Sequence, residues 1–252
     1  MNLEILCGDA VLIEQTHKRS CVTIDGSEEG KMELTTEAIA KLVKEVLVGM
    51  ESGKETPGVK AADGEVPIGV SNRHIHLTRE HVEILFGKGY TLKKLKDLSQ
   101  PGQYACEETV TIVGPSLKPI EKVRILGPER KASQVEISNT DSYVLKVKPP
   151  VRESGKIEGT PGITVIGPCG VVVLKEGVIV ANRHIHMSPD DAVAFGVSDG
   201  DTVTVDVKSA RPTRWFEVQV RVHKDFRLEM HIDTDDANAA CLKNGSRVSV
   251  VK

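Results

Sequence analysis

The sequence contains one pentapeptide twice, and its residues are of the kind that bind metal ions. Asn72-Arg73-His74-Ile75-His76 recurs unchanged as Asn182-Arg183-His184-Ile185-His186. Neutral imidazole is the commonest metal ligand that proteins offer. In a β-strand, residues i and i+2 point to the same face, so each His-x-His presents two imidazoles side by side with an isoleucine behind them. Each pentapeptide therefore predicts a strand that carries half of a metal site.

A longer internal repeat adds a third ligand to each half-site. Each His-x-His is followed by an apolar residue, a helix-capping Thr78 or Ser188 and a short helix, and both halves end in related segments that align Glu136 with His231. The two ligand sets are His74, His76 and Glu136, and His184, His186 and His231. Two His with a carboxylate, and three His, are both known catalytic zinc sets with one open position. We expect zinc first, although iron, cobalt and manganese also suit these ligands.

Arginines near the ligands suggest that the site binds an anion. Arg130 lies close in sequence to Glu136, and Arg221 lies close to His231. Guanidinium stays charged and binds phosphate through two parallel hydrogen bonds, so we favour anion binding for both arginines over a solvated surface role. Gln134 would share a strand face with Glu136 and orient the metal, a water or the phosphate.

Other polar residues beside the motifs are weaker candidates. Arg73 and Arg183 alternate with the ligands along a strand, so they should face away from them and form structural salt bridges. Ser71, Gln100 and Gln103 are candidates for shaping the pocket. The sequence has no P-loop, GxGxxG, GxSxG or CxxC motif, so nucleotide-dependent and serine-hydrolase chemistry have no support.

The composition is that of an ordinary globular protein and excludes several kinds of partner. The 252 residues are 39% hydrophobic and carry a net charge of −3, with both signs interspersed, which does not indicate general nucleic-acid or membrane binding. Aromatic residues make up only 3%, too few for base-stacking platforms, and no apolar run approaches the ~20 residues needed to cross a bilayer. Five scattered cysteines and a start without a signal-peptide pattern predict a reduced, cytoplasmic protein.

From residue 66 onward the pattern is mainly β. Short segments rich in β-branched residues alternate with Gly and Pro turns, which is typical of β-barrels or sandwiches with few helices. We expect strands at 66–70, 109–113, 123–126, 135–137, 143–147, 163–166, 171–174, 202–207, 216–222 and 247–251. Taken alone, the repeat suggests two tandem units, at roughly 66–150 and 160–252.

One amphipathic helix is predicted before the β-rich part. Apolar residues from Leu34 to Leu47 form a single stripe, and a linker with several Gly and one Pro follows to residue 64. The stripe fits a helix packed on its own domain, and the alternative is a detachable helix that docks on a partner. We therefore separate residues 34–64 as helix and linker from an N-terminal extension, 1–33, whose role the sequence leaves open.

Four motifs taken together resemble the PduL-type phosphate propanoyltransferases, and the likeness runs from about residue 66 to the end of the chain. The motifs are Ser71 to Leu77, Gln134 to Ser138, Asn182 to Met187 and Arg227 to Asp235. The resemblance implies a phosphotransacylase with two β-barrels and two metals, usually zinc. It implies conversion of a short-chain acyl-CoA, propanoyl-CoA or else acetyl-CoA, and phosphate to acyl phosphate and coenzyme A.

The resemblance also implies roles for individual residues. The metal of the first set would meet the sulfur of coenzyme A, and the metal of the second set would carry water. Arg130 and Arg221 match arginines implied in phosphate binding. We expect Ser71 and Gln100 to contact coenzyme A. None of the five cysteines lies in a ligand motif, so the reaction needs no covalent nucleophile from the protein.

The resemblance changes the expected domain arrangement as well. In the family the first barrel borrows its opening strand, so residues 65–72 would pair with 182–252, while 73–181 would form the second barrel with a helical insert. The expected fold is a mainly β pseudo-repeat with a swapped first strand. Family members are also met inside bacterial microcompartments, carried there by an amphipathic helix that 34–47 resembles. We further expect a homodimer.

Two other functions fit the same residues. A zinc-dependent acyl-CoA or ester hydrolase would cleave its substrate without any need for phosphate. A metal-stabilised structural or assembly module would tolerate the loss of Arg130 and Arg221. The phosphotransacylase hypothesis is preferred because the four motifs together resemble that family.

Overall fold

The structure, a computed structural model, describes residues 64–251. These residues belong to one compact unit. The N-terminal extension at 1–33, and the helix and linker predicted over 34–64 apart from Gly64, lie outside the described residues. None of the helices within 64–251 combines the length and the apolar character that crossing a membrane requires.

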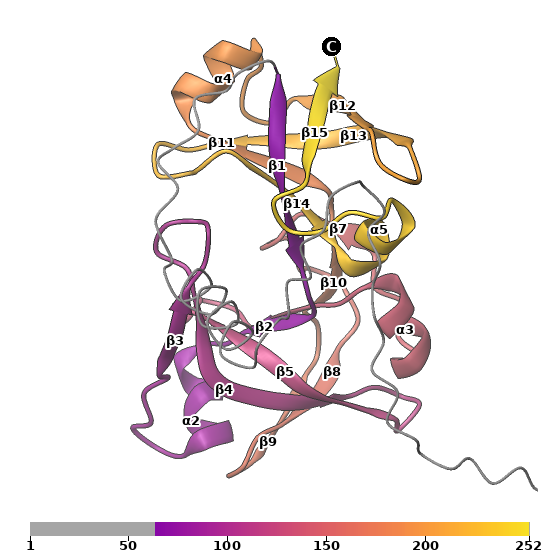
Figure 1. The fold of residues 1–252 in the computed structure, drawn as a ribbon. Helices are drawn as coiled ribbons and strands as arrows, with labels where there is room; N and C mark the ends of the chain where they lie inside the picture. The colour runs from indigo at the N-terminus through magenta and orange to yellow at the C-terminus, as the bar shows by residue number, and fades with distance from the viewer. Residues whose placement is uncertain (1–63, 252) are drawn as a thin grey trace, which may run out of the picture. The chain divides into compact units, whose positions relative to one another are not determined.

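Six strands close into a barrel, in the upper part of Figure 1. They are β1 (Glu65–Ser71), β11 (His184–Met187), β12 (Thr202–Val207), β13 (Thr213–Val222), β14 (Glu229–Asp233) and β15 (Arg247–Val251). The order around the barrel is β1-β14-β11-β13-β12-β15. Most of these strands come from the second half of the sequence, but β1 does not.

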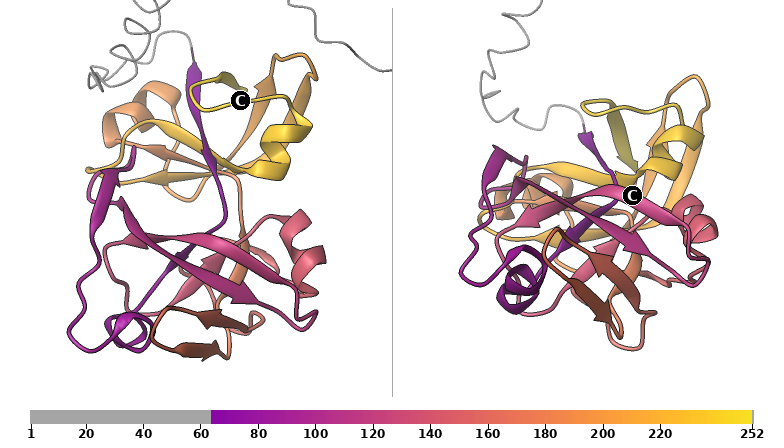
Figure 2. Two further views of the ribbon diagram at one scale, coloured as in Figure 1. Left: turned by 60° about the horizontal axis from the view of Figure 1, so that its bottom comes forward. Right: turned by 90° about the horizontal axis from the view of Figure 1, so that it is seen from below.

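The remaining strands form a curled, open sheet below the barrel in Figure 1 and in the left view of Figure 2. They are β2 (His74–His76), β3 (Lys94–Asp97), β4 (Tyr104–Val113), β5 (Pro119–Gly127), β6 (Gln134–Glu136), β7 (Val151–Arg152), β8 (Ile163–Ile166), β9 (Val171–Leu174) and β10 (Val178–Ala181). Their order is β7-β10-β6-β2-β5-β4-β8-β9, with β3 paired to β4. The mainly β fold is confirmed. The second predicted barrel is a half-barrel, because β7 and β9 end the sheet without pairing to each other.

Strand β1 belongs to the barrel although it precedes the whole half-barrel in the sequence. It pairs in parallel with β14, where Ile68 stands opposite Met230, and antiparallel with β15. The chain then leaves the barrel through Asn72-Arg73 and returns to it through Asn182-Arg183, between β10 and β11. The predicted swap of the first strand is therefore confirmed, and each pentapeptide begins where the chain crosses between the two sheets.

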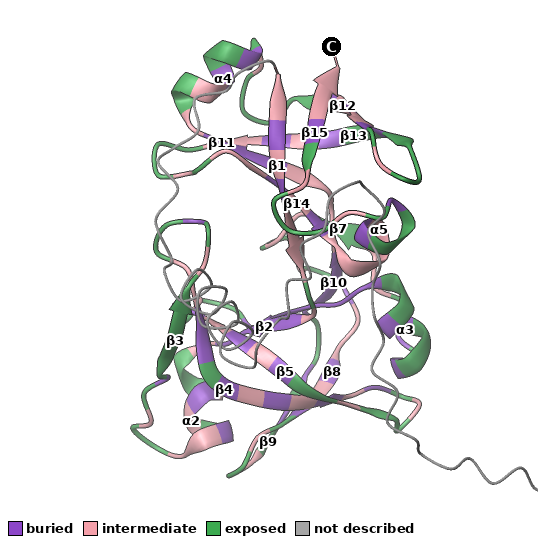
Figure 3. Cartoon of the chain, in the orientation of Figure 1, coloured by how far each residue is buried: buried purple, intermediate pink, exposed green. Residues whose placement is uncertain are grey.

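Each sheet has its own apolar core, and the His-x-His strands are anchored in these cores. The buried segments in Figure 3 fall into one cluster for the half-barrel and one for the barrel. Ile75 lies in the first cluster and Ile185 in the second, both 0% exposed. Burying an isoleucine contributes about 1.5–3 kcal/mol, which fixes the flanking histidines on the opposite strand face.

Within residues 64–251, four short helices follow the strands, and their caps explain where they begin. The helices are α2 (Arg79–Phe86), α3 (Asn139–Leu145), α4 (Pro189–Phe195) and α5 (Thr234–Ala239). As predicted, Thr78 caps α2 by accepting a hydrogen bond from the His81 N–H, and Ser188 caps α4 by accepting one from the Asp191 N–H. These side chains satisfy backbone donors that a helix start leaves free.

The strand predicted over 143–147 is wrong, because α3 occupies most of that segment. A capping box starts the helix directly after β6. The Ser138 Oγ accepts from the Asp141 N–H at 3.2 Å, and the Asp141 carboxylate accepts from the Ser138 N–H at 3.3 Å. Lys146 ends the helix in the left-handed conformation. The local cap outweighs the β preference of the Tyr-Val-Leu sequence.

Replacing Ile68 with Ala should destabilise the barrel. Ile68 is 1% exposed and packs in the same core as Trp215, the single tryptophan of the chain. Removing a buried isoleucine side chain costs about 2–5 kcal/mol of unfolding free energy, so the urea midpoint followed by Trp215 fluorescence should fall. Ile84→Ala, at a position 41% exposed on α2, is the control. Equal shifts in the two variants would contradict the assignment of β1 to the barrel core.

Candidate metal and anion site

All six predicted metal ligands line one cavity between the barrel and the half-barrel. The cavity has a volume of about 240 Å³, and both sheets contribute to its wall. The predicted ligands in that wall are His74, His76, Glu136, His184, His186 and His231. Residues far apart in the sequence thus share a single space.

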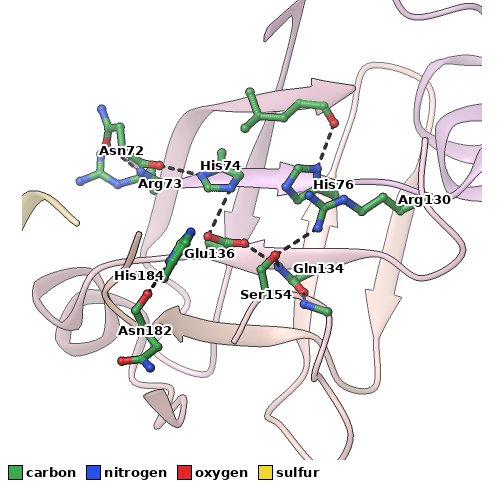
Figure 4. Close-up of polar contacts among 12 residues, drawn as sticks. Asn72, Arg73, His74, His76, Arg130, Gln134, Glu136, Ser154, Asn182 and His184 are labelled. Carbon is green, nitrogen blue, oxygen red and sulfur yellow. Dashed lines mark hydrogen bonds and ion pairs between the residues drawn. The ribbon is translucent and has the colours of Figure 1, made fainter. Parts of the chain in front are cut away.

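The first set comes from the neighbouring strands β2 and β6. These strands are antiparallel, with His74 opposite Glu136 and His76 opposite Gln134. The Nε2 of His74 lies 3.4 Å from the Glu136 Oε2, and the candidate ligand atoms of His74, His76 and Glu136 all lie within 4.8 Å of one another (Figure 4). Such spacing suits three ligands of one ion.

Hydrogen bonds fix the ring orientation of the first two histidines. The Nδ1 of His74 donates to the Asn72 carbonyl at 2.8 Å, and the Nδ1 of His76 donates to the Leu126 carbonyl at 3.2 Å (Figure 4). A carbonyl only accepts, so Nδ1 carries the proton in each neutral ring. The lone pair therefore lies on Nε2, which is free to bind a metal.

The second set comes from β11 and β14, where His184 stands opposite His231. The three ring centroids of His184, His186 and His231 lie 4.8–5.3 Å apart. The Nδ1 of His184 donates to the Asn182 carbonyl at 2.8 Å, as its counterpart does in the first set. Both ring nitrogens of His186 are buried and have no hydrogen-bond partner among residues 64–251. Leaving such atoms unsatisfied costs about 1–3 kcal/mol, which a bound metal ion would offset.

The electrostatics of the cavity keep most ligands in the state that a metal requires. Burial, together with the charge of His74, lowers the pKa of His76 to about 3. Burial and neighbouring positive charges lower the pKa of His184 to about 4 and that of His186 to about 2. Burial opposes ionisation of Glu136, but the charge and hydrogen bond of His74 outweigh it and hold this carboxyl pKa well below its usual range. Neutral His76, His184 and His186 beside an ionised carboxylate fit a metal ion. For His74, burial opposes protonation but Glu136 outweighs it and raises the pKa, so this ring would release its proton when a metal binds.

Besides Arg73, which is paired with Asp141, two arginines bring positive charge to the same cavity. The Arg130 Nη1 donates to the Ser154 Oγ at 3.2 Å. Arg221, on β13, stands opposite His186 in the barrel, and its Nε lies 3.7 Å from the Glu153 Oε1. Both arginines line the cavity, which gives an anion two guanidinium groups to bind.

The structure places Gln134 behind the first ligand set. Its side chain is 2% exposed, and its Nε2 donates to the Glu136 Oε1 at 2.6 Å and to the Ser154 Oγ at 2.8 Å. Its Oε1 accepts from the Gly155 N–H at 2.7 Å. Every polar atom of this amide is used, so Gln134 holds the carboxylate of Glu136 in place.

The two residues expected to contact coenzyme A lie in different surroundings. Ser71 lines the cavity, as does Gln103. Gln100 is buried and bridges the two sheets instead. Its Nε2 donates to the Arg227 carbonyl at 3.0 Å, and its Oε1 accepts from the Arg227 N–H at 3.2 Å.

The arginines of the two pentapeptides form the predicted salt bridges. Arg73 binds Asp141 through Nε and Nη2, each at 2.8 Å from a carboxylate oxygen. The Nε of Arg183 lies 3.7 Å from the Asp236 Oδ2. Both aspartates occupy the third position of the helix that follows the third ligand, so the internal repeat includes these ion pairs.

Sequence reasoning missed several residues of the site. Ser154 and Glu153 position the two arginines, and Phe226 stacks on His186 with ring centroids 4.3 Å apart. These residues lie in segments without motif or repeat partner, so the sequence offered no signal for them. Glu229, which accepts from the His231 Nε2 at 2.7 Å, was also missed. Aligning the two repeats over the two residues before the third ligand pairs Glu229 with Gln134, and this alignment would have identified Glu229.

Comparison with known proteins agrees with these features. A model of the phosphate propanoyltransferase family matches residues 67–243. A phosphate propanoyltransferase of Lachnoclostridium phytofermentans is 55% identical over 215 residues, covering 85% of this chain and 97% of that protein. One from Thermotoga maritima is 58% identical over 186 residues, covering 73% of this chain and 88% of that protein. One from Rhodopseudomonas palustris is 45% identical over 226 residues, covering 88% of this chain and 100% of that protein.

The matched region contains the half-barrel, the barrel apart from β15 and the first two residues of β1, and every candidate ligand and arginine of the cavity. The relatives share about half of their residues with this chain over nearly their whole length. The chain therefore belongs to the phosphate propanoyltransferase family, which is a family of acyltransferases.

Proposed function

We propose that the protein is a phosphotransacylase that converts a short-chain acyl-CoA and phosphate to acyl phosphate and coenzyme A. Propanoyl-CoA is the substrate we expect first, and acetyl-CoA is the second candidate. The site would hold two metal ions, for which zinc is the first choice. The observation that carries the proposal is a single cavity lined by both candidate ligand sets and by Arg130 and Arg221, in a chain of this family.

The proposed reaction exchanges one bond for another at the acyl carbon. A phosphate oxygen forms a bond to the carbonyl carbon, and the bond from that carbon to sulfur breaks. The electron pair of the broken bond goes to sulfur, which leaves as the thiolate of coenzyme A. The phosphate loses a proton as it is acylated, and the released thiolate takes one up.

The arginines are the groups proposed to hold phosphate. Arg130 is oriented by Ser154, and Arg221 is oriented by Glu153. Guanidinium binds phosphate oxygens in pairs and stays charged, so two of them would fix the nucleophile beside the thioester. The same positive charge would stabilise the oxyanion that develops on the carbonyl oxygen.

The two ligand sets are proposed to hold one metal ion each. When bound, such ions supply positive charge that lowers the pKa of a thiol and stabilises charge on oxygen. Gln134 would keep the Glu136 carboxylate aimed at the first ion, since its amide already donates to that carboxylate. Ser71, in the cavity wall, is proposed to contact coenzyme A.

Removing the metal should abolish activity, and turnover should require phosphate. Dialysis against a strong chelator should stop coenzyme A release from propanoyl-CoA, and zinc should restore it, because the ligands alone cannot supply the positive charge of the metal. The measurement is thiol release with and without phosphate, together with metal content per chain. Release that continues unchanged without phosphate would indicate a hydrolase. Full activity of metal-free protein would contradict the metal site.

Removing either cavity arginine should impair phosphate use. Arg130→Ala and Arg221→Ala should each lower kcat/KM for phosphate by roughly 10²–10³-fold, because one charged donor to the nucleophile and oxyanion is lost. The lysine variants should recover only part of the loss, since lysine lacks the paired donors.

Arg214→Ala is the matched control for these variants. Arg214 lies on the same strand as Arg221 but pairs with Asp206 at an exposed position. Steady-state kinetics at varied phosphate, on proteins with unchanged circular dichroism, would make the comparison. Cavity variants that behave like the control would rule out the phosphate role.

We also propose that the helix predicted over 34–47 directs the enzyme into a bacterial microcompartment, and that the enzyme is a homodimer. The motivation is the apolar stripe in the sequence, followed by a segment that contains Gly and Pro. Residues 1–64 fused to a fluorescent protein should form puncta in cells that assemble such compartments. Diffuse fluorescence would count against targeting, and a monomer mass in light scattering would count against the dimer.

A further inference from the structure

Glu229 occupies the barrel position that Gln134 occupies in the half-barrel. In the β2–β6 pair, Gln134 stands opposite His76. In the β11–β14 pair, Glu229 stands opposite His186. Each of these residues precedes the third ligand of its set by two positions and shares its strand face. The internal repeat therefore includes a fourth polar residue in each half.

The hydrogen bond between this fourth residue and the third ligand runs in opposite directions in the two halves. In the half-barrel, the Gln134 amide donates to the Glu136 carboxylate at 2.6 Å. In the barrel, the His231 Nε2 donates to the Glu229 carboxylate at 2.7 Å. A carboxylate ligand needs a donor behind it and an imidazole ligand needs an acceptor, so each fourth residue matches the ligand that it touches.

This contact decides which nitrogen of His231 carries the lone pair. A carboxylate only accepts, so in the neutral ring that a metal requires Nε2 carries the proton and Nδ1 carries the lone pair. His74, His76 and His184 have the opposite arrangement, with Nδ1 donating to a backbone carbonyl. The Nε2 of His74 faces Glu136, the other member of its own ligand set, at 3.4 Å. His231 therefore differs from the other histidines in the atom that it offers to a metal.

The Glu229 carboxylate is held from three sides. The Ser99 Oγ donates to it, and the Gln100 Nε2 lies 3.5 Å from its Oε2. On the adjacent strand β1, the backbone of Gly69 packs against the carboxylate. The approach is so close that a Cβ added to Gly69 would lie 2.8 Å from the Glu229 Cδ. The Glu229 side chain is 16% exposed. The half-barrel and the barrel together thus enclose it.

We propose that Glu229 is a positioning residue that fixes His231 so that Nδ1 faces the second metal, and that Ser99 and Gln100 hold Glu229 in place from the half-barrel. This inference rests on the proposed second metal site. It makes that site depend on docking of the two sheets, because the carboxylate that orients a barrel ligand is anchored by half-barrel side chains.

Zinc affinity tests the role of Glu229 without any activity measurement. Competition with a coloured chelator should resolve two zinc affinities in the unaltered enzyme. Glu229→Ala should weaken one of them by roughly 10- to 100-fold and leave the other unchanged. Glu229→Gln, which keeps an acceptor oxygen, should recover most of the loss. Glu217→Ala removes an exposed carboxylate from the same barrel and should change neither affinity.

Ser99→Ala tests the same contact if Glu229→Ala fails to fold. It should weaken the same zinc affinity by a smaller factor, because Glu229 loses one of its anchors. Unchanged affinities in all these variants would overturn the role of Glu229 while leaving the proposed reaction intact. An unaltered enzyme that binds no zinc at the three-histidine set would overturn both this inference and the two-metal site.

The binding atom of His231 has its own readout. Long-range ¹H–¹⁵N spectra of the zinc-loaded enzyme distinguish protonated from metal-bound ring nitrogens. The signals that disappear in His231→Gln should show a protonated Nε2 and a metal-bound Nδ1. A metal-bound Nε2 on His231 would overturn the proposal, whatever the catalytic activity of the sample.

Discussion

The register of two antiparallel strand pairs is the constraint on which the site depends. Period-two alternation puts both imidazoles of His-x-His on one strand face, and the opposite strand adds the third ligand directly across from the first histidine. Ile75 and Ile185 bury themselves on the other face. A slip of one residue would exchange the buried isoleucines for imidazoles, so apolar burial in the two cores enforces the geometry of the ligands.

The cavity is a property of both sheets together. Besides Gln100 and Arg227, the Thr140 N–H donates to the Asp235 carboxylate across the interface at 2.7 Å. Glu153, from the half-barrel, lies beside Arg221 of the barrel. These links hold one ligand set opposite the other across a cavity in which most of the ligands are buried. Charges that face each other across such a space interact more strongly than they would in bulk water.

The sequence alone predicted what is local or repeated. Spacing and alternation predicted the His-x-His strands and the helix caps at Thr78 and Ser188. They also predicted that Arg73 forms a structural salt bridge, which it does with Asp141. The swapped strand came from family resemblance, because no local pattern reveals the partner of a strand. Closure of one sheet and not the other depends on pairing between distant edges. Ser154 and Phe226 reach the cavity from segments without a motif, so only the folded chain brings them there.

The swapped strand also bears on the order in which the chain folds. Residues 65–71 are synthesised first among the described strands, but they pair with 229–233 and 247–251, which are synthesised last. All strands of the half-barrel lie between these segments in the sequence. They can therefore pair with one another before the last barrel strands are synthesised. Contacts so distant in sequence form slowly, and an unpaired strand is prone to aggregate meanwhile. We therefore expect the half-barrel to fold first, while β1 stays unpaired until the last two strands close the barrel.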